Sequence, residues 1–426
     1  MSRFARAAAA ALLIAGLTAC GGSGGGAPTL TWYINPDNGG QADLAEVCTE
    51  AADGKYRIET SLLPNDADGQ REQLVRRLAA NDSSVDLMSL DVTFVPEFAE
   101  ARFLRPFSDD DAAELTRGVL DAPRKTVEWN DQVVAAPFWA NTQLLWYRKS
   151  VAQEAGLDLS QPVTWDQVID AARTTRTTVE VEAGLYEGYM VWINALVVSG
   201  GGEVVKDPAA GKDAKPELAS DAGRTAAEII HRVATSGVAD PQINTAIEET
   251  ARVGFQAGNG GFMVNWPYIY AAAKSAVQDG SLDQSVVDDI GWARFPQVDA
   301  GTESAPPLGG IDLGIGAFSR HENLAVDAVE CITSVHNQTA YMLAEGNSGA
   351  RAAVYDDSAV REQFPMADLI RDSIDTAGSR PRTPYYTDVS SATVREFHPP
   401  SSVDPGSTPR NADDLISNVL QGNALL

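Results

Sequence analysis

The segment from Gly261 to Tyr270 combines a short apolar run with two aromatic residues on a stiff turn. Gly261 to Val264 predicts a short buried strand. Pro267 fixes its own φ and restrains the residue before it, so Trp266 and Tyr268 are displayed where the strand ends. The carboxyl ends of strands are where open α/β sheets bind ligands. A flat indole suits the apolar face of a sugar ring; the alternative is that both aromatics are core residues.

Acid and amide side chains that could bind the hydroxyl rim of such a ring follow two further predicted strands. Asp91 ends the apolar run 85–90, and the turn from Asn35 to Asn38 ends the run 30–34. Because carboxyl ends of parallel strands share one rim of a sheet, we expect these residues to lie together. The alternative for Asp91 is a cap on the helix expected over residues 93–100.

Two extended segments are expected to carry the chain across between lobes. Residues 133–148 hold an aromatic and amide centre with Asn141, which we expect to face a cleft. The glycine-rich segment 306–318 predicts a strand that returns to the first lobe, since glycine lets backbone approach a ligand closely. Glu248 and Glu249 precede the residues leading to Phe255: either one points into the cleft, or both form a solvated pair.

The amino terminus carries the features of an export signal. Arg3 and Arg6 precede an apolar run that is too short to span a bilayer, and the run ends in Leu17-Thr18-Ala19-Cys20. This end resembles the lipobox of bacterial lipoproteins, which implies that residues 1–19 are a signal peptide and that Cys20 carries lipid. A glycine-rich tether over residues 20–28 suits a globule held at a membrane. The alternative is an ordinary secretory signal with a chance cysteine.

Composition excludes several classes of protein. The net charge of −27 over 426 residues repels nucleic acid and keeps the chain soluble. The four histidines are scattered, and the chain has no H-E-x-x-H, C-x-x-C or P-loop motif, so we predict no metal and no cofactor. The length is too great for one core, so two lobes are expected, in a monomer.

The remaining two cysteines form an even pair. With Cys20 lipidated, Cys48 and Cys331 are left in an exported chain, and each lies on an amphipathic helix. One disulfide between them is the natural inference. It would place both helices in one lobe, so that the chain leaves that lobe and returns. The alternative is two separate buried thiols.

The alternation of strand and helix patterns predicts an α/β fold with two lobes. Each lobe is expected to be a sheet covered by helices, and the lobes are joined by hinge strands. We expect residues 29–138 with 305–345 to form lobe 1, residues 139–304 with 346–426 to form lobe 2, and a ligand cleft between them.

Several motifs occur in order across nearly the whole chain. They are the lipobox, the strand ending at Asp91, Pro137–Arg148, Trp266-Pro267-Tyr268, Leu308-Gly309-Gly310 and Arg380-Pro381 through Tyr385. Together they resemble the extracellular solute-binding proteins of carbohydrate ABC importers, in the maltose and trehalose branch, and most closely its trehalose-binding lipoproteins.

The resemblance implies a periplasmic-binding-protein-like fold of type II that closes on a sugar without altering it. It implies a ligand, trehalose or a related disaccharide, that is passed to membrane permease subunits, and a chain anchored by lipid to the outer face of the cell membrane. The ligand-contacting residues it implies are Asn35, Asn38 or Gln41 from the first turn, then Asp91, Asn141, Glu248, Trp266, Tyr268, the backbone of Gly309 and Gly310, and Arg380. One departure is Ile311, where disaccharide-binding relatives often have an aromatic residue.

Two other functions fit parts of the pattern. An exported glycoside hydrolase would need two carboxylates flanking the scissile bond, and Asp91 and Glu248 could supply them. A guanidinium from Arg380 would lower a carboxyl pKa, which does not suit a general acid. A lipoprotein that binds protein or cell-wall glycan for structural purposes is the third possibility.

Overall fold

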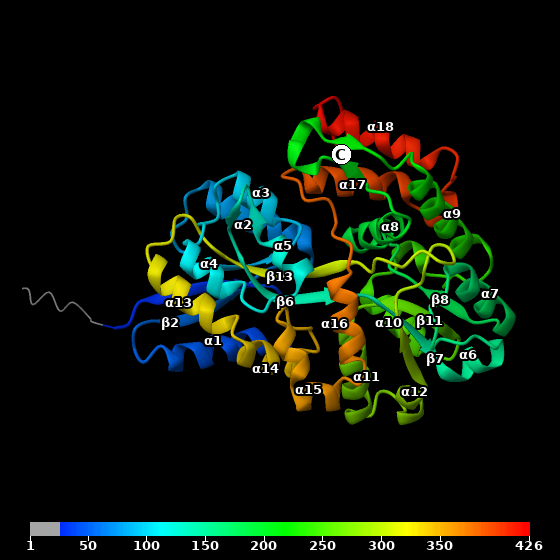
Figure 1. Cartoon of the computed structure of the whole chain (residues 1–426), viewed down its shortest axis with the longest axis horizontal. Coiled ribbons are helices and arrows are strands. Elements are labelled where there is room, and N and C mark those ends of the chain that lie inside the picture. Colours follow the sequence, from blue (N-terminus) through cyan, green and yellow to red (C-terminus); the bar gives the residue numbers. More distant parts are fainter. Residues whose placement is uncertain (1–25) are drawn as a thin grey trace, which may run out of the picture.

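The computed structural model describes residues 26–426, and it is organised around two β-sheets (Figure 1). The predictions for the signal peptide 1–19, for Cys20 and for most of the tether lie outside the described residues. No helix within residues 26–426 is both long enough and apolar enough to cross a membrane.

The first sheet has the strand order β2-β1-β3-β13-β6. Its strands are β1 (Thr29–Ile34), β2 (Arg57–Leu62), β3 (Leu87–Asp91), β6 (Ala136–Thr142) and β13 (Leu308–Ile315). β1 pairs in parallel with β2 and β3, whereas β13 runs antiparallel to β3 and β6. The two strands expected over residues 30–34 and 85–90 are therefore confirmed, and their carboxyl ends lie on one rim.

Helices cover this sheet because each presents an apolar stripe to it. They are α1 (Gly40–Ala51), α2 (Ala67–Ala79), α3 (Val95–Glu100), α4 (Asp109–Leu115), α5 (Asp121–Thr126), α13 (Glu322–Ile332) and α14 (Val335–Glu345). A disulfide joins Cys48 on α1 to Cys331 on α13, with the Cα atoms 5.9 Å apart. Both helices contribute to one core with β1 and β13, as the sequence predicts.

The second sheet has the order β12-β7-β11-β8. Its strands are β7 (Leu144–Arg148), β8 (Thr178–Glu180), β11 (Gly260–Asn265) and β12 (Ile290–Ala293). Around it lie α6 (Lys149–Ala155), α7 (Trp165–Thr175), α8 (Glu187–Ser199), α9 (Asp221–Thr235), α10 (Glu248–Gln256), α11 (Tyr268–Gln278) and α12 (Gln284–Asp288). A capping box begins α7: the Thr164 side chain accepts from the Gln167 amide, and the Gln167 side chain accepts from the Thr164 amide in return.

The chain crosses between the sheets at two places. β6 ends at Thr142 and β7 begins at Leu144, so Gln143 alone separates a strand of the first sheet from one of the second. The chain returns between β12 and β13. In Figure 1 the first sheet lies to the left and the second to the right, with β6 pointing from one to the other. β6 therefore extends beyond residue 138, the expected end of lobe 1.

The carboxyl-terminal helices pack on both halves. They are α15 (Ser358–Gln363), α16 (Ala367–Asp375), α17 (Tyr386–Phe397) and α18 (Thr408–Leu420). Ile370 of α16 shares a core with Leu120 and Ala140 of the first half and Met263 of the second. Val389 of α17 and Ile416 of α18 lie in a different core, with Trp165 and Trp192. The segment between α16 and α17, including Arg380, therefore connects two cores of the molecule.

Removal of the disulfide should destabilise the first lobe. The bridge spans 283 positions in sequence, and on the chain-entropy model such a long loop contributes up to about 5 kcal/mol. We expect the double variant Cys48→Ser, Cys331→Ser to unfold at lower urea concentration than the parent. The parent in dithiothreitol should match the variant, and equal unfolding free energies with and without the bridge would contradict the expectation.

Candidate functional site

Arg380 is a buried cation shared by two carboxylates from different parts of the fold. Its Nη2 lies 3.1 Å from Asp91 Oδ1, at the end of β3, and its Nη1 lies 2.5 Å from Glu187 Oε1, at the start of α8. The Arg380 side chain is 2% exposed. A charge buried to this degree is stable only with such partners. Arg380 therefore ties the rim of the first sheet to the second lobe.

Glu187 is a site residue that the sequence analysis missed. Its carboxylate accepts hydrogen bonds from Ser390 Oγ at 2.6 Å and from the Tyr386 hydroxyl, in addition to Arg380. Burial raises the pKa of Glu187, although Arg380 and the two hydroxyl donors act against it. The sequence offered only an indirect indication of Glu187. A buried arginine that pairs with one acid still has N–H donors for a second acid, so a second partner of Arg380 could be expected.

Asp91 is held by local hydrogen bonds and by Arg380, but it is not the cap of the following helix, as the alternative expectation had it. Its Oδ1 accepts from the Thr93 amide at 2.9 Å and from Thr93 Oγ1 at 2.7 Å, so it closes the turn that leads into α3. The same atom accepts from Arg380. The helix begins at Val95 with Phe94 at its N-cap, so Asp91 lies ahead of the cap position. Local hydrogen bonds fix the carboxylate in the orientation that reaches Arg380.

Trp266 lies against the hinge strand of the other sheet. A Cβ atom added to Gly309 of β13 would lie 2.8 Å from Cη2 of the indole, so the ring approaches the β13 backbone closely. The fully buried Asn265 orients this turn: its Oδ1 accepts from the Trp266 amide at 2.8 Å, and its Nδ2 donates to the Glu248 carbonyl at 3.0 Å. Asn265, which the sequence analysis did not single out, connects two predicted ligand residues.

Gly310 has a structural reason to be glycine. Its φ is +130°, and a Cβ there would lie 2.3 Å from the carbonyl oxygen of Trp139. Its own carbonyl accepts from the Val92 amide at 3.4 Å. Asn141 sits opposite Gly309 in the β6–β13 pairing, is 6% exposed, and its Oδ1 accepts from the Thr142 amide. A role for Gly310 or Asn141 toward ligand stays a prediction.

The three candidates of the first turn have different surroundings. Gln41 is fully buried and donates to the Asn35 carbonyl and Asp37, while its Oε1 accepts from Ser89. Asn38 is exposed and bonded to Glu345. The Oδ1 atom of Asn35 is buried without a hydrogen-bond partner. Asn35 is thus the candidate with an acceptor left for a ligand, and Gln41 positions the turn.

The two glutamates at the start of α10 differ in their hydrogen-bond partners. Glu249 accepts from Tyr268 Oη at 2.6 Å and from Arg252 at 2.7 Å. Burial acts to raise the pKa of Glu249, but the hydrogen bonds from Arg252 and Tyr268 outweigh it and lower the pKa. Glu248 has no cation partner, and burial raises its pKa. Glu248 is the acid of the pair with acceptors left free.

A second acid that the sequence analysis missed lies just after β8. Glu182 is 1% exposed, and its carboxylate accepts from Gln143 Nε2 at 2.9 Å and from Tyr186 Oη at 3.5 Å. Burial, and then the charge of Glu248, raise its pKa well above the usual range. The short run of residues 178–181, with Glu182 directly after it, was the available signal.

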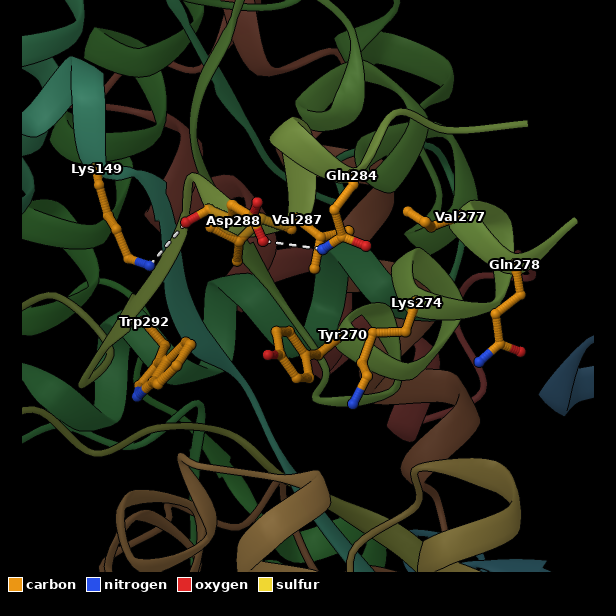
Figure 2. Close-up of a pocket in the computed structure, with 10 residues that line it drawn as sticks. Lys149, Tyr270, Lys274, Val277, Gln278, Gln284, Val287, Asp288 and Trp292 are labelled. Carbon is orange, nitrogen blue, oxygen red and sulfur yellow. Dashed lines mark hydrogen bonds between the residues drawn. The ribbon is translucent and has the colours of Figure 1, made fainter. Parts of the chain in front are cut away.

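The described part of the chain has one cavity that borders this region and another that lies apart from it. One of about 740 Å³ is bounded by Asn38 and Glu345 of the first half and by Arg252, Tyr268 and α11 of the second, so it opens beside the candidate site. Another, of about 360 Å³, is formed by α11, α12 and β12 (Figure 2). Its lining includes Trp292 but none of the predicted ligand residues.

The chain matches the family model described as bacterial extracellular solute-binding protein over residues 38–339. A probable ABC transporter-binding protein of Deinococcus radiodurans is 25% identical over 389 residues, with 87% of this chain and 88% of the relative covered. The diacetylchitobiose binding protein DasA of Streptomyces coelicolor is 23% identical over 321 residues, covering 74% and 71%. The relatives thus span most of the chain.

Solved structures show the same two-lobed fold. Maltose-bound MalE3 of T. maritima superposes with a TM-score of 0.79 at 24% sequence identity, covering 93% of this chain and 100% of that one. The expected two-lobed α/β architecture is therefore confirmed. The family and these neighbours are binding proteins, so the expectation that the chain is not an enzyme is also confirmed.

Loss of Arg380 should destabilise the fold through its partners. Arg380→Gln leaves Asp91 and Glu187 without a cation, which costs about 3–5 kcal/mol for a buried pair. Adding Glu187→Gln removes one unpaired charge, so the double variant should be more stable than the single one. Urea denaturation measures both. The exposed pair Arg76–Glu72 supplies the control Arg76→Gln, and an equal loss there would contradict the assignment.

Glu180 should make stability depend on pH. Burial raises its pKa from 4.5 to about 7, and the charge of Asp240 adds to this. Between these pH values the folded protein keeps a proton that the unfolded chain releases, so the free energy of unfolding falls by up to about 3 kcal/mol as pH rises. Glu180→Gln should show a smaller fall than the parent, because only the contribution of Glu180 is removed, whereas Glu228→Gln on α9 should fall as the parent does. Parallel pH profiles for parent and Glu180→Gln would disprove the linkage.

Proposed function

The chain belongs to the family of bacterial extracellular solute-binding proteins, and from this premise we propose that it is the substrate-binding lipoprotein of an ABC sugar importer. We propose trehalose or a closely related disaccharide as the ligand, bound between the lobes and delivered to permease subunits. The observation that carries the proposal is the approach of Trp266, from the second lobe, to the β13 backbone of the first.

The chemistry of the interlobe residues suits a neutral saccharide. An indole plane supplies apolar area and orientation for a sugar ring. Carboxylates with free lone pairs, such as Glu248, and the unpartnered oxygen of Asn35 accept hydrogen bonds from hydroxyl groups. Arg380 has a further buried nitrogen, Nε, without a partner. Both lobes therefore carry polar groups that a sugar hydroxyl could pair with.

Trp139 compensates for the departure at Ile311. Ile311 packs into the core of the first lobe and is 5% exposed, so it offers no face to a ligand. Trp139 lies opposite Ile311 in the β6–β13 pairing, is half-buried, and has an indole Nε1 without a partner. We propose that Trp139 supplies the second aromatic surface.

Closure of the lobes is the proposed mechanism. A ligand shifts the equilibrium toward the closed form only by the contacts it makes in that form and lacks in the open one. Trp266 and Glu248 belong to the second lobe, whereas Asn35 and Asp91 belong to the first, so a ligand that contacts both sets stabilises closure. β6 and β13 act as hinge strands, and the closed form is what the permease recognises.

The neighbours' ligands support a saccharide, and the leader supports export. Relatives are described as binding diacetylchitobiose or maltose. Lipid on Cys20 would hold the protein at the outer face of the membrane, beside its permease. The glycosidase alternative loses support because the family consists of solute-binding proteins and because Asp91 Oδ1 is already engaged by Arg380 and Thr93.

Binding measurements on two variants test the proposal. Asp91→Ala and Trp266→Ala should each weaken trehalose binding at least about a hundredfold by calorimetry, since both remove central buried contacts. Trp292→Ala, in the cavity of Figure 2, is the matched control and should bind as the parent does.

Retained micromolar affinity in both site variants would remove these residues from the site. Glucose released from trehalose during incubation with the parent protein would instead support a hydrolase. Circular dichroism of each variant shows whether loss of binding reflects loss of fold.

A further inference from the structure

Tyr186 lies between two carboxylates and has one proton to donate. Its hydroxyl is 3.5 Å from Glu182 Oε2. The segment that leads to Glu248 runs alongside, since the Gly184 amide donates to the Ala246 carbonyl at 2.9 Å, and the Glu248 charge acts on the same phenol. A phenol donates a single hydrogen bond. One of the two glutamates is therefore always left with an acceptor that Tyr186 does not satisfy.

Gln143 adds a third acceptor to this group. Its Nε2 donates to Glu182 Oε1 at 2.9 Å, which orients the amide and leaves Oε1 as its free end. That oxygen is buried without a hydrogen-bond partner, in a residue that is 1% exposed. A buried acceptor without a donor costs about 1–3 kcal/mol, and a ligand that supplies the donor recovers this free energy.

The cations of the site are committed elsewhere. Arg252, on the same helix as Glu248, binds Glu249 and Gln256, and Arg380 is held by its own two carboxylates. Within residues 26–426 no three acidic, histidine or cysteine groups are arranged to hold a metal ion. The negative charge around Glu248 is therefore not balanced by a cation of the described chain.

The more exposed members of this group are Tyr186 and Glu248. Glu182 and Gln143 are almost fully buried, whereas Tyr186 and Glu248 are half-buried. The pKa of both glutamates is raised, by burial first and for Glu182 by Glu248 next. The pair consequently holds a proton more readily than free glutamates do, and a bound cation would take the place of that proton.

We propose that Glu182, Glu248 and Gln143 form a subsite for a protonated amino group on the saccharide, so that the chain prefers an amino sugar to its hydroxyl analogue. An ammonium group brings three donors and no acceptor, which matches three acceptor groups without a cation. A hydroxyl brings one donor and leaves the other acceptors unsatisfied. The inference rests on the proposed function, because Asn265 ties Glu248 to Trp266 in the same cleft.

Calorimetry on the full mature chain tests the subsite. The probes are trehalose and the four monoamino trehaloses with the amine at C2, C3, C4 or C6, each also in N-acetylated form. At least one amino isomer should bind at least about tenfold more tightly than trehalose, since close buried charge pairs couple strongly. N-acetylation, which removes the charge, should abolish that advantage.

Variants locate the effect. Glu182→Gln preserves shape and removes one charge, so the advantage of the amine should be lost while the trehalose affinity changes less. Glu228→Gln, exposed on α9, makes the same change in net charge and should retain the advantage. Melting temperatures of both variants establish that they are folded.

The outcomes separate the subsite from the proposed function. Trehalose binding with no gain for any amino isomer overturns the subsite and leaves the proposed function standing. An advantage that survives in Glu182→Gln also overturns the assignment. If neither trehalose nor any amino isomer binds, the proposed function fails and the subsite with it.

Discussion

The structure depends on one buried guanidinium. Arg380 comes from the segment that connects α16 to α17, and it holds a carboxylate of the first sheet and one of the second lobe at the same time. Burying any one of these charges alone would cost several kcal/mol. Asp91 and Glu187 are themselves largely removed from solvent, so each depends on the Arg380 cation. The three groups therefore fix the relative position of elements that lie far apart in the sequence.

The glycines of β13 have the complementary effect. At Gly309 the absence of a side chain lets Trp266 lie on the hinge backbone, and at Gly310 it lets β6 approach. The lobes can therefore come into close contact beside the strands that join them. A larger residue at Gly309 would hold Trp266 away from the strand. The position of the indole therefore depends on a residue of β13 that is distant from it in the sequence.

Sequence patterns were sufficient for most elements of the fold. The strands ending at Ile34 and Asp91, the capping box at Thr164 and the crossing near Asn141 follow from periodicity and capping chemistry, which act over a few residues. The cysteine pairing followed from counting in an exported chain. The candidate ligand set came largely from motif order, and it included Arg380 but not the second acid that Arg380 binds.

The sequence by itself determined where several of the strands lie and end and which aromatic and acid residues stand at those ends, because these are local properties of the chain. Only the tertiary structure decided that Arg380 is shared by Asp91 and Glu187, and that Glu182 accepts from both Gln143 and Tyr186. Such pairings join residues up to 289 positions apart. Their partners are selected by burial and charge balance in the folded state, and no local pattern records either.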